Sequence, residues 1–127
     1  MAISEDLLHQ SIDLIAGISQ LEMDPVALAQ DVALLELFYE DELSFKQAIT
    51  SICRSITQLA SGMVTGTVLK QSHTDWYSYH FQYSRSQGQR ADLRVIYQMH
   101  AGAIRVKGFG HRFVPSDIYE RLGIIKT

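Results

Sequence analysis

The stretch DLRVIYQMHAGAIRVKGF, residues 92–109, decides the fold of this chain. Apolar and polar residues alternate in it on both sides of Ala101-Gly102. Strict alternation is typical of strands in an antiparallel sheet that is buried on one face only. A short Ala-Gly segment suits a tight turn, because glycine readily adopts a positive φ. The stretch therefore predicts a hairpin with one buried and one open face.

The same period of two continues upstream of the hairpin. In WYSYHFQYS, residues 76–84, the odd positions are aromatic and the positions between them are polar. Trp76 and this aromatic series are expected in the core, and a further strand is expected in MVTGTVLKQ, residues 63–71. The polar, basic segment SRSQGQRA, residues 84–91, is predicted as the loop that leads into the hairpin.

The first 62 residues follow a helical period instead. Three helices are predicted, within residues 4–21, 23–42 and 44–62. Their expected end signals are Ser4 as an N-cap, Asp24 followed by Pro25, Ser44 and Gln47 in capping-box spacing, and Gly62 as a stop.

These elements predict an α+β fold in one domain covering residues 1–127, a length that suits a single core. Residues 1–62 form the acidic helical part, which packs on one face of a small antiparallel sheet. Residues 63–127 form that basic sheet and a short C-terminal helix.

Charge is distributed unevenly between these two parts. Residues 1–50 hold ten acidic residues and one base, whereas residues 51–127 hold ten bases and four acidic residues. The formal charges are therefore −9 and +6. Such asymmetry favours a polyanionic partner for the basic half. Equally, the two halves could attract each other on folding.

Composition argues against a membrane-spanning, an exported or a disulfide-bonded protein. No apolar run is long enough for a membrane span, and Glu5 and Asp6 stand where an export signal carries positive charge. Cys53 is the single cysteine, so no internal disulfide is expected. We expect a cytoplasmic protein without a membrane partner, and the dispersed histidines predict neither a metal site nor a cofactor.

If the aromatic and aliphatic positions face the helices, the opposite face of the sheet is cationic. His111 and Arg112 are expected to leave the sheet beside that face. Two interpretations stand: a solvated surface, or a site for the phosphates of a nucleic acid. The cationic positions are His80, Arg94, His100, Arg105 and Lys107.

The run LRVIYQMHAGAIRVKGFGHR, residues 93–112, and the following DIYERL, residues 117–122, resemble the C-terminal half of the RelE/ParE superfamily of bacterial toxins. VLKQSHTDWYSYHF, residues 68–81, resembles the segment before it. The resemblance covers roughly residues 66–122. It implies a small toxin fold, cleavage of RNA including messenger RNA on the ribosome, and neutralisation by an antitoxin protein.

The resemblance also implies site residues. Arg94 matches the arginine of the family's "RVIY" strand. Arg112 matches the arginine of the family's "GHR" motif, and His111 precedes it. Tyr119 matches the tyrosine of the family's "VYRRL" motif. Histidine transfers protons near neutral pH, and arginine grips phosphate oxygens. These four residues are the predicted catalytic group, and His80, His100, Arg105 and Lys107 are predicted to bind RNA. Alternatively, the arginines pair with acids of the helices, His111 is a surface residue, and Tyr119 closes the core.

The predicted function is therefore that of a RelE-like toxin, a metal-independent RNA endonuclease neutralised by an antitoxin. Three alternatives remain open. A ParE-type toxin of the same fold would inhibit DNA gyrase by binding, and a non-catalytic relative would only bind RNA or protein. In the third, the acidic helices cover the basic face and the protein is an inert interaction module.

Overall fold

The computed structural model describes residues 3–69, 76–82, 91–113 and 117–123. Five strands form one sheet in the order β1-β5-β4-β3-β2. The helices are α1 (Glu5–Ala16), α2 (Pro25–Phe38), α3 (Glu42–Ser61) and α4 (Ile118–Arg121). The strands are β1 (Leu21–Glu22), β2 (Thr67–Val68), β3 (Tyr77–Phe81), β4 (Leu93–His100) and β5 (Ala103–His111). The predicted α+β class is confirmed.

The long helices begin and end largely where the sequence predicts. Ser4 and Asp24 cap α1 and α2 by accepting hydrogen bonds from the N–H groups of Leu7 and Ala27. Gly62 ends α3 in the left-handed conformation. The predicted capping box at Ser44 is wrong. Asp41 caps α3 instead, and its carboxylate accepts the Ser44 N–H at 2.9 Å.

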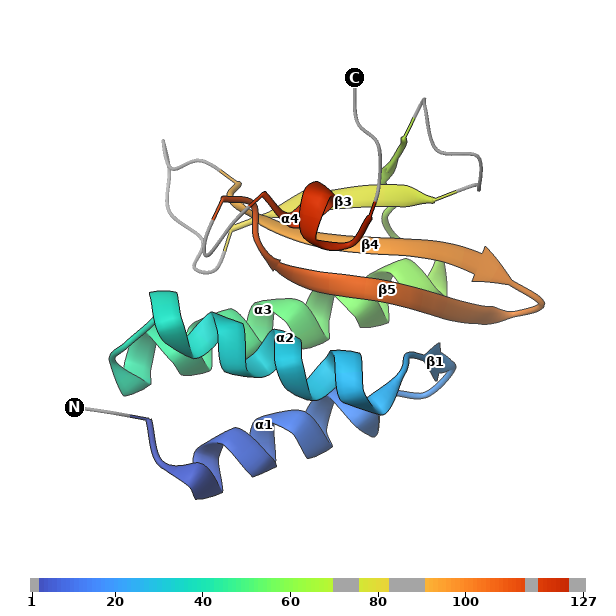
Figure 1. The fold of residues 1–127 in the computed structure, drawn as a ribbon. Coiled ribbons are helices and arrows are strands. Elements are labelled where there is room, and N and C mark those ends of the chain that lie inside the picture. Colours follow the sequence, from blue (N-terminus) through green and yellow to red (C-terminus); the bar gives the residue numbers. More distant parts are fainter. Residues whose placement is uncertain (1–2, 70–75, 83–90, 114–116, 124–127) are drawn as a thin grey trace.

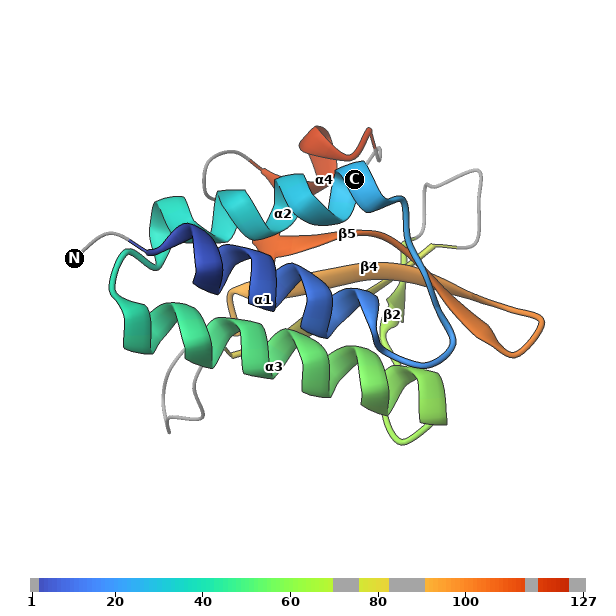
Figure 2. The same ribbon diagram turned by 90° about the horizontal axis from the view of Figure 1, so that it is seen from below.

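The three long helices all lie on one side of the sheet, and α4 lies on the other (Figure 1). Seen from the helical side, α1 lies in front, between α2 and α3 (Figure 2). It is therefore the outermost layer, and its described residues bury only Ser11 and Ile15. The face of the sheet opposite α2 and α3 is left to the short helix α4, so part of it remains open.

One strand departs from the predicted pattern. Residues 1–62 were expected to be wholly helical and the sheet wholly antiparallel, yet β1 pairs in parallel with Ile104 and Arg105 of β5. Leu21 and Glu22 are too few to show an alternation, so their pairing carries no sequence signal. The sheet is thus mixed, with antiparallel pairing among β5, β4, β3 and β2.

The hairpin of β4 and β5 contains a bulge that changes which side chains face the helices. Ile96 pairs with Gly108, but the next residue, Tyr97, pairs with Val106, so Lys107 is the extra residue. Past a bulge of this kind the alternation of the strand is inverted. Ile104 and Val106 face the helices before the bulge, and Phe109 faces them after it.

The main core lies between the sheet and the long helices. Phe45 of α3 and Phe109 of β5 are its largest fully buried side chains, each of a size whose burial stabilises by roughly 1.5–3 kcal/mol. A second, smaller cluster lies under α4, on the other face. Trp76 is partly buried against this second cluster, on the face of the sheet opposite the Tyr77 series. The Tyr77, Tyr79 and Phe81 positions do pack against the main core, as predicted.

Two predicted segments extend beyond the residues that the structure describes. The strand expected in residues 63–71 is present as β2, and residues 70 and 71 lie outside the described ranges. Most of the loop predicted for residues 84–91 also lies outside them. Within the described ranges, no helix has the length and apolar run that spanning a bilayer requires.

Candidate functional site

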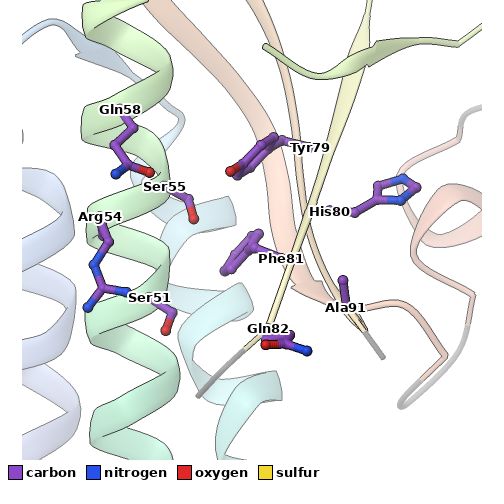
Figure 3. A pocket seen from close by; sticks show the side chains of 9 residues that line it. All are labelled: Ser51, Arg54, Ser55, Gln58, Tyr79, His80, Phe81, Gln82 and Ala91. Atoms are coloured by element: carbon purple, nitrogen blue, oxygen red, sulfur yellow. The ribbon is translucent and has the colours of Figure 1, made fainter. Parts of the chain in front are cut away.

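The face of β3 opposite the long helices carries an exposed histidine. Figure 3 shows the rings of Tyr79 and Phe81 turned toward α3 and the ring of His80 turned away from it. His80 pairs with Arg94 across β3 and β4, so both side chains stand on the same face of the sheet. Ser78, two residues before His80, shares that face.

Helix α4 brings a tyrosine hydroxyl to this histidine. Tyr119 is 2% exposed, and its hydroxyl shares a hydrogen bond of 2.7 Å with the Ser78 Oγ. The same hydroxyl lies 3.5 Å from the His80 Nε2. Gly108 lets α4 approach this closely, because a Cβ there would come within 2.7 Å of the Leu122 side chain. A buried hydroxyl therefore orients an exposed imidazole.

Arg112 lies next to the same tyrosine. Its guanidinium carbon is 4.6 Å from the centre of the Tyr119 ring and 4.8 Å from that of Phe113. An ion pair of 2.5 Å joins Arg112 to Asp117, and the arginine side chain is 11% exposed. The hydrogen bond from Arg112 lowers the pKa of Asp117, which also caps α4 through the Tyr119 N–H. Arg112 thus fixes α4 on the sheet and adds positive charge beside Tyr119.

Arg94 completes the group. Its side chain folds back and donates to the backbone carbonyls of Ala91 and Leu93. The Arg94 Nε is buried and has no hydrogen-bond partner among the described residues. We call the set of Ser78, His80, Arg94, Arg112 and Tyr119 the His80 cluster.

The predicted position of His111 is wrong. Pairing with Leu93 places it on the helical face, because the bulge at Lys107 inverts the alternation of β5. The His111 ring is 8% exposed and packs at 4.3 Å, centre to centre, on the ring of Phe38. Its Nδ1 accepts the Phe113 N–H at 3.1 Å. His111 therefore packs on the helical face of the sheet, opposite the face that carries the His80 cluster, and holds the backbone of Phe113 through its Nδ1.

The other predicted RNA-binding residues lie along the hairpin, away from the cluster. Lys107 stands 5.3 Å over the Trp76 ring. Arg105 donates to Gln98 and lies 3.9 Å from Glu22, so it meets an acid of the N-terminal half. His100 is exposed at the end of β4, about 20 Å along the strand from Arg94. The structure thus brings His80, Arg94, Arg112 and Tyr119 together and leaves His100, Arg105 and Lys107 apart.

Sequence reasoning missed Ser78, a member of the His80 cluster, and Asp117, the ion-pair partner of Arg112. Ser78 had a signal, because it shares the polar positions of its strand with His80. Asp117 precedes a short helix and so reads as an ordinary cap, which it also is.

A separate groove of about 260 Å³ lies between α3 and β3 (Figure 3). Because the His80 ring points away from it, this groove and the His80 cluster lie on opposite sides of β3. The groove is lined by Ser51, Arg54, Ser55, Gln58, Tyr79, His80, Phe81, Gln82 and Ala91.

Comparison with known proteins identifies no relative: no protein-family model, curated protein or solved structure matches this chain. Among the described residues, no three side chains of the metal-binding types converge.

The burial of His111 predicts a pH-dependent stability. Burial lowers the pKa of His111 below its ordinary value, Asp92 opposes this effect, and Arg94 adds to it. His111 therefore binds a proton more readily in the unfolded chain than in the folded chain. As a result, the free energy of unfolding falls as the pH drops below about 6.5. A His111→Phe variant keeps the ring but cannot titrate. We expect its free energy of unfolding to change less between pH 7.5 and pH 5.5 than that of the wild type.

Urea unfolding followed by circular dichroism at the two pH values measures this difference. A variant of the exposed His9, His9→Ala, serves as the control and should retain the wild-type pH dependence. Equal pH dependence in the wild type and His111→Phe would show that His111 titrates alike in the folded and unfolded chains.

Proposed function

We propose that this chain is a metal-independent RNA endonuclease of the RelE type, acting in the cytoplasm and neutralised by an antitoxin protein. The observation that carries the proposal is an exposed imidazole, His80, held by the buried Tyr119 hydroxyl on an open sheet face beside Arg94 and Arg112. An acid–base group oriented by a second side chain is a common arrangement for proton transfer.

The chemistry follows from these groups. In cleavage without a metal, the 2′-oxygen of a ribose bonds to the adjacent phosphorus, and the bond from phosphorus to the 5′-oxygen breaks. His80 takes the proton of the 2′-hydroxyl, and water supplies a proton to the leaving 5′-oxygen. Arg94 lies opposite His80 in the register, and in this mechanism its guanidinium leaves the backbone carbonyls of Ala91 and Leu93 to stabilise the charge that develops on the phosphate. Tyr119 positions His80, and Arg112 holds Tyr119 in place through its contact with the ring and its ion pair with Asp117.

One observation favours a second candidate, a non-catalytic module that binds RNA or protein. Tyr119 is buried, and Arg112 is already paired with Asp117, so both have structural partners within the chain. In that case the His80 cluster serves to hold α4 on the sheet, and the remaining cations bind a polyanion without cleaving it.

Incubation of the purified protein with end-labelled single-stranded RNA in the presence of a chelator tests the proposal. The expected products carry a 2′,3′-cyclic phosphate or a 3′-phosphate, because the 2′-oxygen attacks. DNA of the same sequence should stay intact, since it lacks that nucleophile. A parallel assay offers messenger RNA on ribosomes.

Intact RNA in both assays, together with retained RNA binding, would contradict the nuclease and favour the binding module. Inhibition of gyrase supercoiling without RNA cleavage would instead favour a ParE-type toxin.

A further inference from the structure

The groove between α3 and β3 carries polar side chains that the proposed function does not use. Tyr79 and Phe81, two residues apart in β3, form one wall of the groove and face α3 (Figure 3). The α3 residues of the other wall recur at intervals of three and four, so they share one face of the helix. They are Ser51, Arg54, Ser55 and Gln58. Two of these four are serines, whose small side chains leave the space between helix and strand unfilled.

Several polar groups of the groove lack partners within the protein. Ser55 is 5% exposed, and Figure 3 shows its hydroxyl and that of Tyr79 pointing into the space between α3 and β3. Among the residues that the structure describes, neither hydroxyl has a hydrogen-bond partner, and the Arg54 guanidinium has neither a hydrogen bond nor an ion pair. A buried hydroxyl without a partner is unfavourable, and a molecule bound in the groove would satisfy it.

The charge of the lining indicates what kind of molecule fits. Arg54 is exposed, and the described lining of the groove contains no Asp or Glu, so the groove favours an anion. One guanidinium balances one negative charge. It therefore suits a carboxylate better than a phosphate monoester, whose charge is about −1.5 to −2 at neutral pH.

The shape of the lining indicates a small, flat molecule. The rings of Tyr79 and Phe81 are nearly parallel, with an interplanar angle of 18° and centres 5.9 Å apart, so this wall is flat and aromatic. The volume of about 260 Å³ lies just below the range of roughly 300–1,000 Å³ that is usual for sites of drug-sized ligands. A single aromatic ring with one acidic group suits both the wall and the volume.

We propose that the groove between α3 and β3 binds a small aromatic carboxylic acid, with its carboxylate on Arg54 and its ring against Tyr79 and Phe81. The hydroxyls of Ser55 and Tyr79 supply further hydrogen bonds to the carboxylate. Because the groove and the His80 cluster lie on opposite sides of β3, this site stands independently of the proposed function.

Isothermal titration calorimetry of the full chain with benzoate tests the site, and we expect one benzoate to bind per protein. Arg54→Gln should lower the affinity by about 10- to 100-fold, because it removes a charge-assisted hydrogen bond. Tyr79→Phe removes only a hydroxyl and should lower the affinity by about 2- to 10-fold. Lys46→Gln is the matched control, since it removes another exposed cation of α3 that does not line the groove, and it should bind like the wild type.

Two analogues of benzoate separate the contributions of charge and ring. Benzamide keeps the ring without the charge, and phenyl phosphate keeps the ring with a larger charge. Both should bind at least about tenfold more weakly than benzoate. Equal affinity for benzamide, or tighter binding of phenyl phosphate, would overturn the carboxylate site. Equal affinity of Arg54→Gln and the wild type for benzoate would overturn it too, as would the absence of saturable benzoate binding up to about 10 mM.

Discussion

An Asp31→Ala variant is expected to lose about 3–5 kcal/mol of its free energy of unfolding. Asp31 is a buried carboxylate on α2 that accepts the Phe109 N–H at 3.0 Å and pairs with the Arg121 guanidinium at 2.6 Å. β1 pairs with residues 104 and 105 of β5, so the Phe109 N–H lies beyond the end of β1. The Asp31 carboxylate accepts this N–H in place of a neighbouring strand. Burial raises the pKa of Asp31, and both partners act against that rise.

Removal of the Asp31 carboxylate leaves both of its partners unpaired. The Phe109 N–H loses its acceptor, and the Arg121 side chain, which is mostly buried, loses its counter-ion. Because Arg121 belongs to α4, the docking of α4 on the sheet weakens too. Asp31→Asn should cost less, since its oxygen can still accept the Phe109 N–H.

Urea denaturation measures the loss, with Lys46→Ala as the control. Lys46 makes an exposed ion pair with Glu42 within α3, and such pairs contribute less than about 1 kcal/mol. If Asp31→Ala and Lys46→Ala were equally stable, the buried network would not hold α2, β5 and α4 together.

The second large effect concerns cleavage. His80→Ala is expected to lower the rate of RNA cleavage by about 10²- to 10⁴-fold, because it removes the proposed proton-transfer group. The His80 side chain is exposed, so the variant should unfold at the same urea concentration as the wild type. Single-turnover cleavage at saturating enzyme separates this loss from any loss of RNA binding.

His100→Ala is the matched control, since it removes an exposed histidine from the same sheet at the far end of β4. Its cleavage rate should stay within about threefold of the wild type, on the scale of an uninvolved surface residue. Equal rates in the His80 and His100 variants would remove His80 from the mechanism.

Much of the fold could be predicted because local rules agree with one another. The alternation around Ala101-Gly102 predicts the hairpin, and both turn residues adopt a positive φ. Helix ends at Ser4, Asp24 and Gly62 follow from their side-chain chemistry. The parallel strand β1 could not be predicted, because two residues carry no period.

The site could be predicted only in part, for one geometric reason. His80 and Arg94 were predicted on the face opposite the long helices and lie there, and Tyr119 reaches that face from α4. His111 was expected to leave the sheet beside that face, but the bulge at Lys107 inverts the alternation of β5 and turns His111 to the helical face. Gly108, directly after Lys107, was the available signal, because a glycine inside a strand often marks a bulge.

In the proposed function, RNA binds the sheet face that carries the His80 cluster. Chemical-shift mapping with a 2′-O-methyl single-stranded oligonucleotide tests it most directly. We predict that the largest amide shifts occur at Ser78, His80, Arg94, Arg112 and Phe113, with little change in α1. Shifts confined to the long helices, or to the groove between α3 and β3, would contradict the account.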